Sequence, residues 1–327
     1  MHTLFREVVP VKGRTLLRFL IPLAGIGLFL CFPDRTGTGV RAGLSLCAGV
    51  LVPTLFPVSV LAGCLIRMSV GAHAGQWTER RMQALFGLPG TGALPLLLGM
   101  LGGFPLGAQL AAAACETGQL TKEEAARLSG LCNNAGPAFL LGSVGTMLGS
   151  PVLGCTLFGI QMLASLITGL LFRRPSVRRA AATQKAAGRP PSLGAILPRC
   201  IGESAGAMLR LTGAVCFFQA VLSCLETILP ISSLPSLWQA AVSGALELTG
   251  GLSLLRSQQG WAALPTAAAL IGWGGLCVHL QAAEALNRAG LPMGPYLLHK
   301  AVQAGISLLL AALLVCLKNF TGNLRIL

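Results

Sequence analysis

The chain has 327 residues, of which 54% are hydrophobic and only 10% are charged, and its mean hydropathy is +0.73. Soluble domains carry about 25% charged residues, so this composition excludes a soluble globular protein and indicates an integral membrane protein. The formal net charge of +14 would suit a nucleic-acid partner, but the basic residues gather at the ends of apolar runs, as in loops that orient membrane proteins. We therefore expect a lipid bilayer around the chain and no nucleic-acid partner.

Nine apolar runs approach or exceed the length that crosses a bilayer, which is about 20 residues. The first run resembles a signal peptide, but no small-residue cleavage site follows it, so we expect a retained transmembrane helix within residues 1–40. The runs are 15–32, 41–67, 93–115, 123–148, 152–172, 204–229, 237–255, 261–286 and 295–317. The sequence therefore predicts an all-α, polytopic transmembrane protein.

A basic segment, residues 173–192, separates the first five runs from the last four. It is rich in alanine and proline and contains no acidic or aromatic residue. Such a segment cannot bury a core, and its positive charge is typical of the cytoplasmic side, so we expect a cytoplasmic linker. The linker divides the rest of the chain into a first unit, residues 41–172, and a second unit, residues 193–327.

Two clusters of helix-breaking residues interrupt the apolar stretch 101–145. They comprise Gly103, Phe104, Pro105 and Gly107 in the first cluster, and Asn133, Asn134, Gly136 and Pro137 in the second. Irregular backbone at membrane depth is tolerated only against protein or a water-filled cavity, and broken apolar segments point to the solute sites of transporters. We expect helix breaks at both clusters and a substrate-binding or gating role for the second. The alternative is that the breaks only allow helices to pack closely.

The two units show a weak internal similarity. A shift of 172 residues places Gly274 and Gly275 on the first break and aligns Gln109 with Gln281. We expect a second-unit helix break at the glycine pair, and the two glutamines either bind solute as a pair or hydrogen-bond between helices.

The positions of the basic residues predict how the two units are oriented in the membrane. If 93–115 is a re-entrant segment, nearly every basic cluster falls on the linker side. The second unit then has inverted topology relative to the first, and Lys318 also ends on the linker side.

Three charged residues are candidates for a functional role. Glu247 lies within an apolar run, where a carboxylate is costly and functional by default, so we predict that it carries the coupling proton or sodium ion. Arg127 and Lys300 lie early in helices and could attract an anion. Charges near helix ends also commonly reach the interface or set topology, and this alternative stays open.

Enzyme chemistry has no support in the sequence. The cysteines and histidines form no metal-binding pattern, and neither a nucleophile–base motif nor a phosphate-binding loop is present. We expect a protein that is not an enzyme, with no catalytic residue, no bound metal and no cofactor.

Several motifs resemble a known family. GGFPLGAQL, ETGQLTKEEAARL and LCNNAGPAFLLGSVG in the first unit, and LELTGG and GGLCVHLQ in the second, are similar to the nucleoside-recognition (Gate) domain, specifically to bacterial sporulation integral membrane proteins of the YlbJ (SpoVV) type. The resemblance covers most of residues 49–317. It implies a transporter in endospore formation that moves dipicolinate, a small anionic solute, across the mother-cell-derived outer forespore membrane.

Two other functions stay open from the sequence. The chain could transport nucleosides or another small solute, or it could be a non-transporting assembly or signalling protein of the sporulation membrane. The residues alone leave the coupling ion, the direction of transport and a homo-oligomeric state undecided.

Overall fold

A computed structural model describes residues 13–68, 70–174, 192–258 and 260–324, and in these residues it contains helices and no strand. The first unit and its leader contain α1 (Gly13–Cys31), α2 (Pro33–Leu46), η1 (Cys47–Leu51), α3 (Val52–Arg67), α4 (Val70–Phe86), η2 (Gly90–Gly92), α5 (Ala93–Gly102), α6 (Leu106–Glu116), α7 (Lys122–Cys132), η3 (Ala138–Val144), α8 (Gly145–Met147) and α9 (Pro151–Leu171). The second unit contains α10 (Leu193–Ile228), η4 (Pro230–Ser233), α11 (Ser236–Leu246), α12 (Leu248–Leu254), η5 (Leu255–Ser257), η6 (Gly260–Ala263), α13 (Leu264–Trp273), α14 (Gly275–Arg288) and α15 (Met293–Leu324). The predicted all-α architecture is confirmed, whereas most of the predicted linker, residues 175–191, lies outside the described residues.

Long apolar helices account for most of the predicted runs. Among the described residues, five helices are long and apolar enough to cross a membrane. They are Pro33–Arg67, Pro151–Leu171, Leu193–Ile228, Gly260–Arg288 and Met293–Phe320. The chain is therefore an integral membrane protein with several spans, as its composition predicts.

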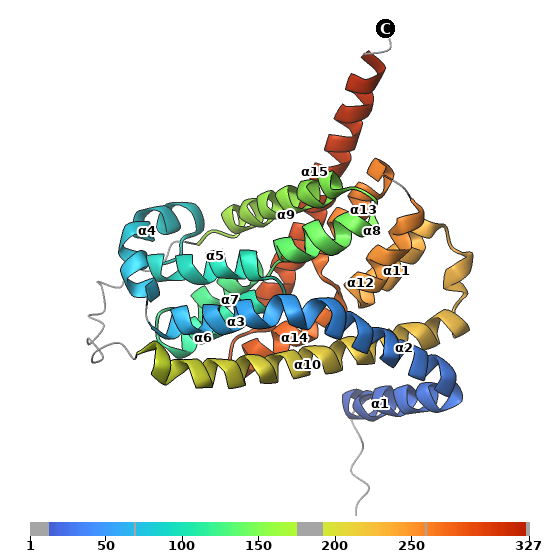
Figure 1. Ribbon diagram of the computed structural model, residues 1–327, viewed down its shortest axis with the longest axis horizontal. Helices are drawn as coiled ribbons and strands as arrows, with labels where there is room; N and C mark the ends of the chain where they lie inside the picture. Colours follow the sequence, from blue (N-terminus) through green and yellow to red (C-terminus); the bar gives the residue numbers. More distant parts are fainter. Residues whose placement is uncertain (1–12, 69, 175–191, 259, 325–327) are drawn as a thin grey trace, which may run out of the picture.

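The helix formed by α2, η1 and α3 packs antiparallel along α10, and Figure 1 shows the two lying side by side. Glycines make this approach close: a Cβ added at Gly43 would lie 2.7 Å from the Cα of Cys216, and one at Gly39 would lie 2.6 Å from the Cα of Ala220. Further along, Gly63 faces Cys200. Because the residue numbers rise on one helix as they fall on the other, α3 ends near the beginning of α10, where the linker joins it.

The α5–α6 segment turns back on itself as a helical hairpin. A Cβ added at Gly99 would lie 2.8 Å from the Cα of Gly107, so glycines let the two arms touch. At the open end, the Thr91 hydroxyl donates to the carbonyl of Gln119 at 2.9 Å. This geometry matches the expected re-entrant segment 93–115, with residues 103–105 at its tip.

The α11–α12 segment forms a second hairpin, with Glu247 at its tip. A Cβ added at Gly251 would lie 2.2 Å from the Cα of Gly244, and the Gln258 amide hydrogen-bonds to the Ser236 hydroxyl at the open end. The sequence predicted the run 237–255 as one straight segment. It is instead two short antiparallel arms, because closely spaced glycines allow the backbones to touch.

Each hairpin is followed by an interrupted helix and then by a long helix. In the first unit, α7 and η3–α8 are separated by the break at 133–137 and run antiparallel to α9, with Gly154 of α9 packed against the Leu140 carbonyl. In the second unit, α13 and α14 are separated at Gly274, and α13 packs along α15. The sequence of hairpin, interrupted helix and long helix thus occurs in both units.

This arrangement corrects two expectations. The break at 102–103 lies at a hairpin tip, whereas Gly274 and Gly275 interrupt a span, so the 172-residue shift aligns different elements; small-residue identities arise easily in such sequences. Lys318 lies over the ring of Trp261 at 4.0 Å, beyond the open end of the α11–α12 hairpin. The end of α15 is therefore opposite the linker, because 237–255 turns back instead of crossing.

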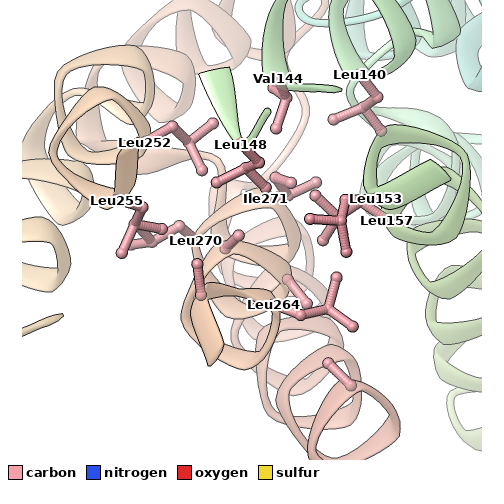
Figure 2. Packing of buried hydrophobic residues seen from close by; sticks show 14 of the residues in the cluster. Leu140, Val144, Leu148, Leu153, Leu157, Leu252, Leu255, Leu264, Leu270 and Ile271 are labelled. Atoms are coloured by element: carbon pink, nitrogen blue, oxygen red, sulfur yellow. The ribbon is translucent and has the colours of Figure 1, made fainter. Parts of the chain in front are cut away.

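The two units share one apolar core. Figure 2 shows leucines of η3 and α9, and Leu148 directly after α8, packed against leucines of α12, η5 and α13. Fully or almost fully buried members are Leu140, Val144, Leu153, Leu157, Leu252, Leu255, Leu264 and Ile271. Lipid is as apolar as these side chains, so close van der Waals packing, and not transfer out of water, holds the two units together here.

Candidate functional site

The breaks of both units meet in the interior as a chain of contacts. A Cβ added at Gly103 would lie 3.0 Å from the amide nitrogen of Gly136, so the first hairpin tip touches the break that follows α7. The Phe104 ring lies against Gly274, with its Cζ 3.3 Å from the position of an added Cβ. Gly275 follows Gly274 and contacts the second hairpin, because an added Cβ on Gly275 would lie 3.0 Å from the Gly244 carbonyl oxygen.

Positive backbone φ angles explain why glycines occupy these contacts. Gly103 has φ 87°, Gly274 has φ 92° and Gly275 has φ 83°. Residues other than glycine rarely adopt this region. An added Cβ would also be crowded by backbone at Gly103 and Gly275, and by the Phe104 ring at Gly274. The predicted break residues Gly103, Phe104, Gly274 and Gly275 are thus brought together, although they come from elements of different kinds.

The two asparagines at the first break are completely buried, and each side chain both donates and accepts hydrogen bonds. Asn133 accepts the Ala108 amide proton with its Oδ1 at 3.3 Å and donates from its Nδ2 to the Tyr296 hydroxyl at 3.0 Å. Asn134 donates from its Nδ2 to the Leu131 carbonyl at 2.8 Å and to the Ser165 hydroxyl at 3.1 Å. These bonds satisfy polar groups that the helix break frees.

Lys300 of α15 completes this polar cluster. Its ammonium group is fully buried and donates to the Asn133 carbonyl at 2.9 Å, to the Asn134 Oδ1 at 3.2 Å and to the Gln303 Oε1 at 2.7 Å. An ammonium has three donors, so every one is used. No carboxylate is among its partners in the described part of the chain. The carbonyl of Asn133 closes α7, so the charge also faces the negative end of that half-helix.

The cluster reaches into the second unit. The Gln303 amide donates to the Asn134 Oδ1 at 2.8 Å, and the Phe104 ring centroid lies 5.4 Å from the Lys300 Nζ. On the other side, the Tyr296 hydroxyl lies 3.3 Å from the His279 Nδ1. Lys300 therefore lies inside a network that joins the units, and its donors point to this network. Arg127 likewise donates to backbone carbonyls, including that of Gly87 at 2.9 Å.

Gly107 and Pro137 support the same break. An added Cβ on Gly107 would lie 2.4 Å from the Cys132 carbonyl, so only glycine allows α6 to pass this close to the end of α7. Pro137 precedes η3, which is π-helical, and Gln161 of α9 hydrogen-bonds to both the amide and the carbonyl of Ala135. Side chains of α9 thus hold the non-helical backbone in place.

Glu247 caps a half-helix at the second hairpin tip. Its carboxylate accepts from the amide of Thr249 at 3.1 Å, from the amide of Gly250 at 2.6 Å and from the Gln219 side chain of α10 at 2.7 Å. Only 4% of the residue is exposed. The positive end of α12 and three donors therefore stabilise a buried carboxylate.

Some buried polar atoms around the second break have no hydrogen-bond partner among the described residues. They are the Ser243 hydroxyl on α11, the His279 Nε2 on α14 and the Ser307 hydroxyl on α15. Buried polar groups are normally satisfied, so such atoms call for an explanation. They carry free hydrogen-bonding capacity on the helices that surround the second break.

The two predicted glutamines lie in different surroundings. Gln109 of α6 lines a cavity between α3, α6 and α10. Gln281 of α14 is half-buried and donates to the Cys277 sulfur at 3.3 Å, and it does not line that cavity. Among the described residues no hydrogen bond joins the two glutamines, so their action as a pair stays a prediction.

Sequence reasoning missed Tyr296, Gln303, Gln161, Ser165 and Gln219. Each is a polar residue in an apolar helix, which was the available signal. Lys300 and Gln303 are also one turn apart on α15 and share a face. The asparagines that Lys300 and Gln303 contact lie more than 160 positions away in the chain, and such contacts leave no local pattern.

Comparison with known proteins yields one similarity of note. The chain is 26% identical over 310 residues to the sporulation integral membrane protein YlbJ of Bacillus subtilis (strain 168), with 83% of this chain and 75% of the relative covered. No family model matches the chain. No solved structure matches it either. The chain is therefore similar to a sporulation integral membrane protein over most of its length.

Proposed function

We propose that this chain is a secondary transporter in endospore formation that moves dipicolinate across the outer forespore membrane. The observation that carries the proposal is the continuous contact from Gly136 through Gly103, Phe104 and Gly274 to the tip of the second hairpin. Irregular backbone of this kind is costly in lipid and is typical of solute paths between half-helices. The similarity to a sporulation membrane protein supplies the biological setting.

We propose further that the two units are inverted repeats. The first hairpin opens toward the linker end and the second toward the opposite end, and α9 and α15 also run in opposite directions. Two hairpin tips that approach each other from opposite sides are suited to alternating access, in which one side opens while the other closes.

In this account Glu247 and Lys300, the charged side chains that are buried in the described part of the chain, have separate tasks. Glu247 holds the coupling proton or sodium ion, because it is the buried carboxylate at a half-helix end and its neutralisation would change the second hairpin tip. The buried cluster of Asn133, Asn134 and Lys300 stabilises the first break and links it to α15. The nucleoside alternative has no observation in its favour here beyond the shared resemblance.

Complementation in sporulating cells tests the proposal. The chain would be produced in a Bacillus subtilis strain that lacks the related YlbJ protein, and the dipicolinate content of its spores would be measured. We expect the wild-type chain to restore dipicolinate, and Glu247→Gln to reach the membrane in equal amount without restoring it. Full restoration by Glu247→Gln would favour an assembly or signalling role, which needs no ion cycle.

A further inference from the structure

A cavity of about 380 Å³ lies between α3, α6 and α10. Its walls include Ser59 and Gly63 of α3, Gln109 of α6 and a long strip of α10, and Arg288 at the end of α14 also lines it. Cavities that bind small molecules have volumes of about 300–1,000 Å³. The cavity is therefore large enough for one small solute.

Small residues create this space. Gly63, Gly202 and Gly206 line it, together with Ala112 and Ala113 of α6. A Cβ added at Gly202 would meet no atom within 4 Å, and one at Gly206 would meet only the guanidinium group of Arg210. The cavity is therefore open because the residues on the facing helices are glycines and alanines.

The lining is rich in arginine. Arg67, Arg199, Arg210 and Arg288 line the cavity, against only two acidic residues, Glu116 and Glu203. Lining charges therefore sum to four positive minus two negative, a net of two positive charges. Arg288 forms no ion pair with any residue in the described ranges.

One carboxylate already lies between two of the arginines. The Nη2 of Arg67 lies 2.8 Å and 2.6 Å from the two carboxylate oxygens of Glu203, and the Nε of Arg199 lies 2.9 Å from one of them. Hydrogen bonds between a guanidinium and a carboxylate are charge-assisted and short, and here two arginines share one carboxylate. This end of the cavity is thus built to hold a carboxylate group.

A second arginine site lies farther along α10. Arg210 is seven residues from Glu203, which is two helical turns, or about 10 Å, on the same face of the helix. Its Nε donates to Glu284 at 3.1 Å. The two charged sites are separated by Gly206 and Ala207, whose small side chains leave the intervening wall open.

We infer that this cavity binds a small solute with two carboxylates, which enters from the linker end. One carboxylate takes the place of Glu203 between Arg67 and Arg199, and the other is held by Arg210 and Arg288. Gln109 supplies an amide to the body of the solute between them. This inference rests on the proposed transport of a small anion and names its binding site.

The linker-end location follows from the helix ends. Arg67 is the last residue of α3, and Arg288 is the last residue of α14. Arg199 lies near the beginning of α10, and α10 itself begins directly after the linker. The hairpin residue Leu106, next to the first tip, also lines the cavity. The cavity thus extends from the linker end toward the tip of the first hairpin.

Filling the cavity provides the sharpest test, with a matched control on the same helix. Gly202 and Gly213 are both exposed α10 glycines with no atom within 4 Å of an added Cβ, but only Gly202 lines the cavity. Leucine favours helix more than glycine does, so neither substitution should impair folding. Binding of dipicolinate, of the monocarboxylate picolinate and of uridine would be measured by calorimetry on the purified protein in nanodiscs.

We expect Gly202→Leu and Arg288→Gln each to weaken dipicolinate binding by about tenfold or more, as loss of a charge-assisted contact or of the space would. Gly213→Leu and Arg256→Gln, which lie outside the cavity, should bind as the wild type does. Picolinate should bind more weakly than dipicolinate, and uridine should not compete.

Two results would overturn the inference: a folded wild type that does not bind dipicolinate, or unchanged binding by both Gly202→Leu and Arg288→Gln. Transport is judged separately. Binding at this cavity without movement of dipicolinate into liposomes would refute the proposed function alone. Dipicolinate uptake that both cavity variants leave unchanged would refute the site alone.

Discussion

The buried network around Lys300 makes a quantitative prediction about stability. Asn134→Leu removes the oxygen that accepts from the Lys300 Nζ at 3.2 Å and from the Gln303 Nε2 at 2.8 Å. Each buried donor that loses its acceptor costs about 1–3 kcal/mol, so the variant should lose about 2–6 kcal/mol of unfolding free energy. Lys300→Met should cost a similar amount, because the Asn133 carbonyl and the Gln303 Oε1 lose their donor.

The two substitutions together should cost less than the sum of the two alone. In the double variant the Lys300 ammonium is absent, so it cannot be left without the Asn134 oxygen as an acceptor. That part of the free-energy penalty is therefore not paid twice. We expect the double variant to be more stable than the sum predicts by about 1–3 kcal/mol, since contacting residues couple by this amount.

The assay is reversible unfolding in mixed micelles, with helix content followed by circular dichroism as the fraction of denaturing detergent rises. Asn134→Leu combined with Gln219→Leu serves as the control cycle, because Gln219 bonds to Glu247 and not to Asn134. The control cycle should be additive within about 0.5 kcal/mol. Additivity of the Lys300 cycle within the same margin would refute the network as an energetic unit.

Three further predictions concern topology, coupling and backbone. In a cysteine-free background, a cysteine at Ser176 should resist a membrane-impermeant thiol reagent in intact cells, whereas a cysteine at Ser257 should react. The reason is that the linker is basic and the open end of the second hairpin lies opposite it. The reverse labelling pattern would show that the chain has the opposite orientation. In liposomes Glu247→Gln should keep solute exchange but lose accumulation driven by an ion gradient, and unchanged accumulation would leave Glu247 a structural cap. Gly103→Ala should lower the unfolding free energy by about 1–3 kcal/mol because of its positive φ, whereas Gly142→Ala, with free space around it, should be neutral; equal effects would contradict the strain argument.

Much of the architecture follows from the sequence because apolar length and helix breakers act locally. A run such as 152–172 can satisfy its backbone in lipid only as a helix, and the structure forms α9 there. Residues 133–137 cannot continue a helix easily, since Pro137 removes a donor and Gly136 lowers helix propensity. Both features depend on a few residues that are adjacent in the sequence.

The hairpin at Glu247 was harder to predict from length alone. Two short arms of 11 and 7 residues together have the length of one span, so hydropathy does not separate the two shapes. The distinguishing signal is the combination of Glu247 with Gly244 and Gly251, which let the arms touch.

Helix α4 was missed for a different reason. It contains Glu79, Arg80 and Arg81 among apolar residues, so its mean hydropathy is low. Its stability comes from packing rather than from an apolar run: the Glu79 carboxylate accepts the Gly90 amide proton at 2.5 Å. Long-range contacts of this kind also account for Tyr296 and Gln303, which hydrogen-bond to Asn133 and Asn134 of the other unit.

The most direct test of the account is uptake of radiolabelled dipicolinate by liposomes that contain the purified wild-type chain and an imposed ion gradient. We predict accumulation of dipicolinate above the level in protein-free liposomes, no accumulation of uridine, and loss of uptake in a folded variant with leucine at both Asn133 and Asn134. The absence of dipicolinate uptake by the folded wild type, or uptake of uridine in its place, would contradict the account.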